Sequence, residues 1–251
     1  MKNNRLRVAL LLSNKALLEN WELRLLDFIQ NEDRIDLVLI IKDGRTHLRR
    51  ESLYDRIKAK SLGWLIGKIF FRCQYKIEKF LFPRMQTVNA HELLGQLSSI
   101  DCIELFPKEQ GFIDRFSNSD FNKIQEYDLD LILRHGFGII KGPILEAAKH
   151  GIWSFHHGDN AINRGGPAGF WEVANQEEYV GCTLQRLTTE LDGGYIIDKA
   201  YFNRHWSFYQ TQTHTYEGSV SVMIKNIKKL LDGNVISEPS KGYDGPLYVS
   251  P

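Results

Sequence analysis

Two neighbouring histidines and a distant aspartate could catalyse the transfer of an acyl group from one nitrogen to another. The stretch Ser154–Trp171 contains His156 and His157 directly behind an apolar run, and Asp192 lies in an Asp-Gly-Gly stretch further along the chain. When an amine attacks a formyl carbon, the intermediate carries an oxyanion, and a proton must leave the attacking nitrogen. We therefore expect His156 to stabilise the oxyanion, and Asp192 to orient that imidazole and accept the proton.

The alternative interpretation of His156 is a core or capping residue, which is the usual role of an isolated histidine after a strand. His156 is not isolated at the expected sheet edge. It is accompanied by His157, Gly158, the turn Asn163-Arg164-Gly165 and the stretch Asp192-Gly193-Gly194. This grouping favours a functional interpretation.

The rest of the chain predicts the sheet that would position these residues. Apolar runs alternate with segments of helical spacing, which is typical of an α/β fold with a mostly parallel sheet and helices on both faces. The runs expected to be strands are 8–12, 35–41, 102–106, 129–133, 152–155, 183–187 and 195–202, and helices are expected at 142–148 and 215–231. Ligands of such sheets bind at the carboxyl ends of the strands, where His156 would lie.

The segment 51–85 departs from this alternation. It holds eight Lys or Arg, three acidic residues and seven aromatic residues. We expect one or two amphipathic helices, either packed on the core or lying against an anionic membrane surface or a partner subunit. The expected organisation is a main domain over 1–235, with this helical insert at about residues 45–100, and a turn-rich surface tail over 236–251.

The bulk composition excludes several classes of protein. A formal net charge of +1 gives no footprint for nucleic acid. Three cysteines without CxxC spacing predict neither a structural zinc site nor a disulfide framework, and no other metal site is indicated. The first apolar run, 8–12, is too short for a signal peptide or a membrane span, so we expect a cytoplasmic protein.

Several motifs, taken together, resemble a known family. They are Arg134–Ile140 (RHGFGII), Ser154-Phe155-His156, Arg164-Gly165, Gly181-Cys182-Thr183 and Leu191-Asp192-Gly193-Gly194. This set resembles the 10-formyltetrahydrofolate-dependent formyltransferases, and most of all the sugar N-formyltransferases. The resemblance covers about residues 100–235 well, and the first 45 residues only as a β-α-β pattern. It implies a Rossmann-like formyltransferase fold, with the catalytic histidine at His156 and the catalytic aspartate at Asp192.

The sequence departs from the family pattern in two places. The pattern His-x-Ser-Leu-Leu-Pro-x-x-Arg-Gly, laid on His156, keeps Arg164 and Gly165 in register, but Gly158–Ala161 (GDNA) replaces its centre. The family's asparagine two residues before the histidine is Ser154 here. Three alternatives follow for the oxyanion: Ser154 as a weaker donor, a substitute such as Asn160, or loss of activity.

The resemblance also implies the ligands. The cofactor would be 10-formyltetrahydrofolate, and two glycines would let the pterin approach the backbone closely, although they could also be ordinary turn glycines. The cofactor-binding residues implied are Gly136, Phe137, Gly138, Ile139, Ile140, Glu190 and Leu191. Candidates for binding the acceptor are Asn14, Lys15, His157, Asn160, Asn163 and Arg164. The guanidinium of Arg164 would suit phosphate oxygens, although it could equally hold the turn by pairing with a carboxylate.

An amino sugar carried on a nucleotide diphosphate is the expected acceptor, mainly by exclusion. The chain ends soon after residue 231, which leaves no room for the tRNA-binding domain of one branch of the family. The alternatives are a formyltransferase acting on another small amine, a formyltetrahydrofolate hydrolase, and a folate- or nucleotide-sugar-binding homologue without catalysis. Family members of this size often form homodimers.

Overall fold

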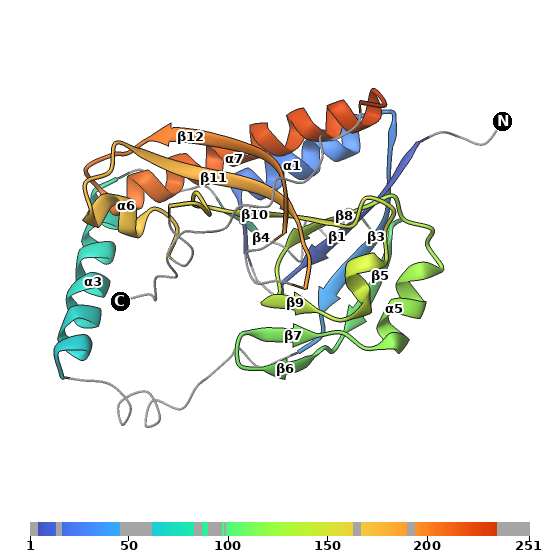
Figure 1. Cartoon of the computed structure of the whole chain (residues 1–251), viewed down its shortest axis with the longest axis horizontal. Helices are drawn as coiled ribbons and strands as arrows, with labels where there is room; N and C mark the ends of the chain where they lie inside the picture. Colours follow the sequence, from blue (N-terminus) through green and yellow to red (C-terminus); the bar gives the residue numbers. More distant parts are fainter. Residues whose placement is uncertain are drawn as a thin grey trace.

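A seven-stranded sheet forms the centre of the protein (Figure 1). This computed structural model describes residues 5–13, 17–45, 62–82, 87–89, 97, 99–162, 167–189 and 194–234. The strands, in their order across the sheet, are β12 (Tyr195–Asn203), β11 (Tyr179–Arg186), β10 (Ile152–His156), β8 (Leu131–His135), β1 (Leu6–Leu12), β3 (Ile35–Asp43) and β5 (Asp101–Leu105). Strands β10 to β5 are parallel, and β11 and β12 are antiparallel additions. The predicted mostly parallel sheet is confirmed.

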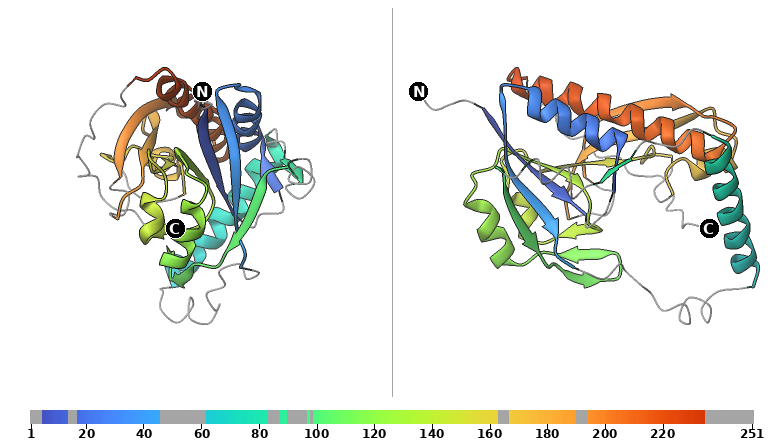
Figure 2. Two further views of the ribbon diagram at one scale, coloured as in Figure 1. Left: turned by 90° about the vertical axis from the view of Figure 1, so that its right-hand side faces the viewer. Right: turned by 180° about the vertical axis from the view of Figure 1, so that it is seen from behind.

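Each face of the sheet is covered by different elements, as the two views of Figure 2 show. Helices α1 (Asn20–Asn31) and α7 (Phe208–Leu231) lie side by side on one face, where they pack against side chains such as Leu10 and Trp153. The other face carries α5 (Asn118–Gln125) and the 3-10 helix η1 (Pro143–Glu146). Helices on both faces therefore agree with the sequence prediction.

The local sequence accounts for these elements. Strand β1 is apolar without alternation because a central parallel strand is buried on both faces. Helix α1 buries Trp21, Leu25 and Ile29, which recur every four residues and so lie on one side of the helix. Its first turn is closed by Glu22, whose carboxylate accepts a hydrogen bond from the Glu19 backbone N–H at 2.9 Å.

Some elements differ from the prediction. The helix expected at 142–148 is the shorter η1, and the helix expected to begin at Thr215 begins at Phe208, because Ser207 caps it by accepting a hydrogen bond from the Gln210 backbone N–H. Five short strands were not predicted. They are β2 (Leu17–Glu19) and β4 (Thr87–Asn89), which pair with each other, and β6 (Lys108–Gln110), β7 (Ile113–Arg115) and β9 (Ile139–Lys141), which form a three-stranded sheet.

The insert contains one long helix within the described residues, α3 (Leu62–Leu81), which contacts α7. A short helix, α6 (Phe170–Ala174), lies beside the same end of α7. None of the helices in the described ranges is long and apolar enough to cross a membrane. The boundary of a surface tail at 236–251 stays a prediction, because those residues lie outside the described part of the chain.

Candidate active site at the carboxyl edge of the sheet

Polar side chains from two neighbouring strands share one face of the sheet near its carboxyl edge. Strand β10 pairs with β11 so that Ser154 lies opposite Gln185 and His156 lies opposite Thr183. Residues opposite each other in an antiparallel pair point to the same face. Ser154, Thr183 and Gln185 are only 1%, 0% and 3% exposed, whereas His156, at the end of the strand, is half-buried. We call Ser154, His156, Thr183 and Gln185 the polar row.

Arg134, near the end of the adjacent strand β8, joins the polar row to the next turn. Its Nη1 donates to Ser154 Oγ at 2.9 Å, and its Nη2 donates to the carbonyl oxygens of Phe137 at 3.0 Å and Gly138 at 2.9 Å. Ser154 Oγ is in turn 3.3 Å from the Phe155 carbonyl oxygen, to which it donates. Ser154 is thus held by a permanent positive charge.

Sequence reasoning missed this role of Arg134, although a signal was present. A cation next to the apolar run 129–133 of a buried strand needs partners, because a charged group is costly to bury unpaired. The arginine itself therefore indicated that oxygen acceptors lie nearby. The sequence could not show that one of them is Ser154.

The turn between β8 and β9 is tightly packed, and its glycines are accounted for in different ways. A Cβ on Gly136 would lie 2.0 Å from the backbone nitrogen of Ser13, so glycine is required there by the approach of the chain after β1. The Gly138 backbone N–H donates to Asp114, a fully buried carboxylate. Phe137 has a φ of 64°, a strained value for a residue with a side chain.

Asp114, which accepts the hydrogen bond of Gly138, is itself held by Arg45. Arg45 Nη1 donates to Asp114 Oδ1 at 2.6 Å, and its guanidinium lies 5.9 Å from the centre of the Phe137 ring. Arg134 and Asp114 therefore hold the turn through the backbone of Phe137 and Gly138, and cofactor binding by Gly136, Phe137 and Gly138 stays a prediction. The edge that follows, β9 with Ile139 and Ile140, is an outer strand of its three-stranded sheet. An edge strand can offer backbone N–H and C=O groups to a flat heterocycle.

His157 lies on the opposite face of the sheet from the polar row. Its ring centre is 4.4 Å from that of Tyr216, 5.3 Å from Phe155 and 6.0 Å from Trp21. Burial, together with the nearby charges of His156, His135 and Arg134, lowers the pKa of His157 to about 3. The imidazole is therefore neutral at physiological pH.

The hydrogen bond of His157 also fixes its tautomer. His157 Nε2 lies 3.2 Å from Ser219 Oγ, and that hydroxyl donates its own hydrogen to the Tyr216 carbonyl oxygen at 2.7 Å. The serine can then only accept from the imidazole, so the proton of the neutral ring is on Nε2. His157 was predicted to contact the acceptor, but its surroundings are those of a core residue between β10 and α7.

The stretch Gly158–Ala161 (GDNA) lies in the loop after β10 and is held by contacts with the outer strands. Asp159 accepts hydrogen bonds from Lys199 Nζ and, at 2.6 Å, from the Tyr201 hydroxyl, and both partners lie on β12. Burial raises the pKa of Asp159, but these hydrogen bonds outweigh burial and hold the pKa below its usual range. Asp159 therefore holds the loop against β12, the edge strand of the seven-stranded sheet.

Asn160 lies inside this loop and is fully buried. Its Nδ2 is 3.5 Å from Gln185 Oε1, a weak contact that places the amide beside the polar row. The hydroxyl of Thr183 donates to the Gly158 carbonyl oxygen at 3.0 Å and holds the start of the same loop. Asn160 is thus near Ser154's partner on β11, whereas its role in binding the acceptor stays a prediction.

Seven predicted site residues fall outside the described residues: Asn14, Lys15, Asn163, Arg164, Glu190, Leu191 and Asp192. The described residue that follows the last of these segments lies close to the polar row. A Cβ on Gly194 would be 3.3 Å from Gln185 Oε1 and 2.3 Å from the Arg186 carbonyl oxygen. The described chain therefore resumes, at Gly194, beside Gln185 of the polar row.

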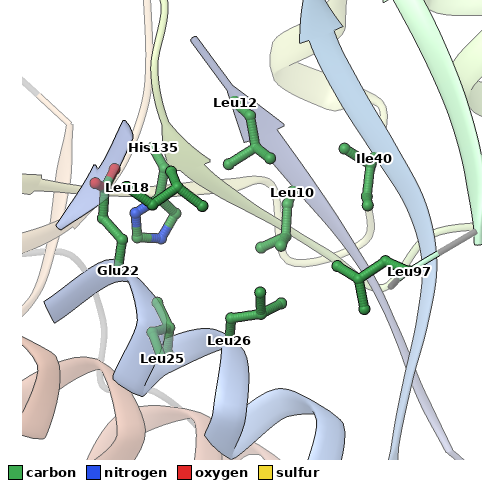
Figure 3. Close-up of a pocket in the computed structure, with 9 residues that line it drawn as sticks. All are labelled: Leu10, Leu12, Leu18, Glu22, Leu25, Leu26, Ile40, Leu97 and His135. Carbon is green, nitrogen blue, oxygen red and sulfur yellow. The ribbon is translucent and has the colours of Figure 1, made fainter. Parts of the chain in front are cut away.

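A small cavity lies on the α1 side of the sheet, away from the polar row (Figure 3). It is lined mainly by leucines of β1 and α1, and Glu22 and His135 stand together at one end of it. Its volume of about 20 Å³ is enough for one water molecule. The cavity is too small for a cofactor, so the polar row is the better candidate for chemistry.

The fold is shared with solved structures of enzymes that transfer or remove formyl groups. An N-formyltransferase from Helicobacter canadensis, in complex with folinic acid and dTDP-3-aminofucose, has a TM-score of 0.57 and 13% identity, and the match covers 97% of this chain and 71% of that one. Glycinamide ribonucleotide transformylase 1 from Symbiobacterium toebii has a TM-score of 0.58 and 15% identity, covering 94% and 92%. A formyltetrahydrofolate deformylase from Pseudomonas syringae pv. tomato has a TM-score of 0.60 and 13% identity, covering 93% and 64%.

The comparisons by sequence are negative: no family model and no curated protein matches this chain. At 13–15% identity the structural likeness shows a common fold. The predicted Rossmann-like formyltransferase fold is therefore confirmed over most of the chain.

Proposed function

We propose that this chain is an N-formyltransferase that moves a formyl group from 10-formyltetrahydrofolate to the amine of a nucleotide-linked amino sugar. The observation that carries the proposal is the placement of His156 at the carboxyl end of β10, on the same face as Ser154 and Arg134. A fold shared with an N-formyltransferase that binds folinic acid and an amino sugar nucleotide supports this substrate class.

His156 and Asp192 would divide the proton and charge transfers between them. Bound 10-formyltetrahydrofolate supplies the formyl carbon. As the amine attacks it, His156 would donate a hydrogen bond to the oxygen that gains negative charge. Asp192 would accept the proton of the amine, and the nitrogen that leaves would regain a proton from the protein or from water. Gly194 packs beside Gln185, which supports placing the segment with Asp192 over the polar row.

Ser154 and Arg134 would together replace the family's asparagine. The Ser154 hydroxyl is held by Arg134 Nη1 and can turn its hydrogen from the Phe155 carbonyl toward the oxyanion. The guanidinium adds a positive charge within one hydrogen bond of this site, and charge-assisted hydrogen bonds are roughly twice as strong as neutral ones. Of the three alternatives for the oxyanion, this contact favours Ser154 as a working donor.

The pterin would lie along the outer edge of β9, against Ile139 and Ile140, with Glu190 and Leu191 on its other side. Phe137, Gly136 and Gly138 would hold this edge in place through the contacts with Arg134, Asp114 and Ser13. The acceptor would approach from the loop after β10, where Arg164 and Asn163 would meet the diphosphate together with Asn14 and Lys15.

A formyltetrahydrofolate hydrolase is the second candidate. The deformylase from Pseudomonas syringae has a TM-score of 0.60 to this chain, slightly above the 0.57 and 0.58 of the two formyltransferases reported above. In a hydrolase, water would take the place of the amine and formate would be released. The same residues would serve both reactions.

Turnover of 10-formyltetrahydrofolate, measured with and without dTDP- and UDP-linked amino sugars, tests the proposal. We expect tetrahydrofolate to form only when an amine is present, with the formylated sugar identified by mass spectrometry. Formate released at the same rate without any amine would establish the hydrolase instead. Turnover only with amines that are not sugars would limit the correction to the acceptor. Folate binding without turnover under any condition would show a binding protein that has lost catalysis.

A further inference from the structure

Helix α3 carries a large apolar surface that points away from the rest of the protein. Six of its large apolar side chains are 56–79% exposed, and monomeric proteins rarely expose so many apolar side chains in one continuous patch. They form two sets with i, i+3, i+4 spacing, 66/69/70 and 77/80/81, which are 11 residues or about three helical turns apart, so all six lie along one side of the helix. We call this the outer face of α3: Ile66, Ile69, Phe70, Ile77, Phe80 and Leu81. Figures 1 and 2 show α3 at one end of the molecule, apart from the seven-stranded sheet.

The opposite side of α3 is fixed to the protein, so the outer face is held outward. The ring of Phe71 lies 5.0 Å from Phe170 and 5.4 Å from Phe208, measured between ring centres. The buried carboxylate of Glu78 accepts hydrogen bonds from Ser207 Oγ and from the Tyr209 backbone N–H, both at 2.8 Å. These contacts with α6 and α7 determine the rotation of the helix about its axis.

A row of cations runs along α3 between its packed side and its outer face. The row consists of Lys68, Arg72, Lys76 and Lys79, at intervals of four, four and three residues. Glu78 is the one acidic residue in the helix sequence, and it faces α7. The described solvent-facing side chains of α3 therefore include positive charges beside the apolar residues and no negative charge.

We infer that α3 lies against an anionic lipid surface, with its outer face in the boundary between head groups and acyl chains. A helix of 20 residues is about 30 Å long, and a basic row beside an apolar face is the pattern of helices that lie in the plane of a membrane. Anionic head groups complement Arg72, Lys76 and Lys79, whereas an uncharged apolar partner would offer these three cations no counter-charge. The outer face buries its side chains in the lipid without any change in the fold.

Flotation of the full-length protein with vesicles tests this inference. We expect binding to vesicles of phosphatidylcholine mixed with phosphatidylglycerol, weak binding to pure phosphatidylcholine, and release as the salt concentration rises. The variant R72Q/K76Q/K79Q should bind about fivefold more weakly for each charge removed. Its matched control is K108Q/K123Q/K149Q, which removes the same charge from exposed positions outside α3 and should bind like the wild type.

A second pair of variants separates the apolar contribution from the charge. F70S/F80S removes two side chains of the outer face, and F106S/F112S removes two equally exposed rings elsewhere. We expect the first variant to lose flotation and the second to keep it, while circular dichroism shows both folded. Equal flotation of wild type and F70S/F80S, or none of the wild type with anionic vesicles, would overturn the inference. So would a stable dimer in solution that F70S/F80S dissociates, because a second copy would then cover the outer face.

Discussion

His156 and His157 are neighbours in the chain, but they belong to opposite faces of the same sheet. His156 ends the polar row of β10 and β11, on the face where Arg134 holds Ser154. His157 lies among aromatic rings on the α1 and α7 face, where its proton is fixed on Nε2 by Ser219. The comparison shows that the two-residue period of a strand, rather than the type of residue, decides which of two adjacent histidines can do chemistry.

The strongest test of this comparison is to remove each histidine separately. His156→Asn should lower kcat of the formyl transfer by about 10²–10⁴-fold, because general acid–base assistance is lost. His157→Asn should change kcat by less than about tenfold, since no step of the reaction passes through its ring. Steady-state rates, measured on variants shown to be folded by near-UV circular dichroism, check this. Similar losses of kcat in both variants would contradict the assignment of the two faces.

The second test concerns the face with the polar row, where Arg134 donates a hydrogen bond to Ser154. Arg134→Met keeps the unbranched apolar part of the side chain but removes the charged guanidinium, and it should lower kcat by about 10–100-fold, the value of a charged hydrogen bond. Ser154→Ala should cost a similar factor alone but little more in the Arg134→Met background, because the two residues act as one unit. Arg24→Met, at an exposed ion pair on α1, is the matched control and should leave kcat unchanged. Fully additive losses at Arg134 and Ser154 would show that the two side chains act independently.

The sequence was sufficient to predict most of the sheet and the place of His156. Long apolar runs such as that of β3 mark central strands, since a parallel strand is buried on both faces. The short strands β6, β7 and β9 could not be predicted, because each has only three residues, and all three residues of β6 (KEQ) are polar and exposed, which leaves no apolar period to follow.

The polar contacts of the site depend on partners that are far apart in the chain. Asp159 meets Lys199 and Tyr201 only because β11 and β12 pair in one register, 40 residues downstream. In the sequence, Asp159 occupies a position where the formyltransferase pattern has leucine, and nothing there indicates Lys199 or Tyr201 as its partners. Asp192 lies outside the described residues, so its role rests on the resemblance.

The lowered pKa of His157, on the α1 and α7 face of the sheet, leads to a prediction about the stability of the protein at acidic pH. The pKa of His157 is lowered to about 3 in the native state and is near 6.5 when the chain is unfolded. The unfolded chain therefore binds a proton between these values that the native protein excludes, so native stability falls as the pH drops below about 6.5. From pH 7.5 to pH 5 the free energy of unfolding should decrease by up to about 2 kcal/mol through this group.

Urea unfolding of the wild type and of His157→Gln at both pH values measures this contribution. The variant should be less stable at pH 7.5 but should lose less stability on acidification, because it has no imidazole whose pKa is lowered in the native state. Ser219→Ala is the matched control. It removes the hydrogen bond to Nε2 and should cost about 1 kcal/mol at either pH, while the dependence on pH is kept. If His157→Gln retained the full pH dependence, the acid sensitivity would arise from other groups. His157 would then not be the residue that links the aromatic surroundings of α1 and α7 to the stability of the protein in acid.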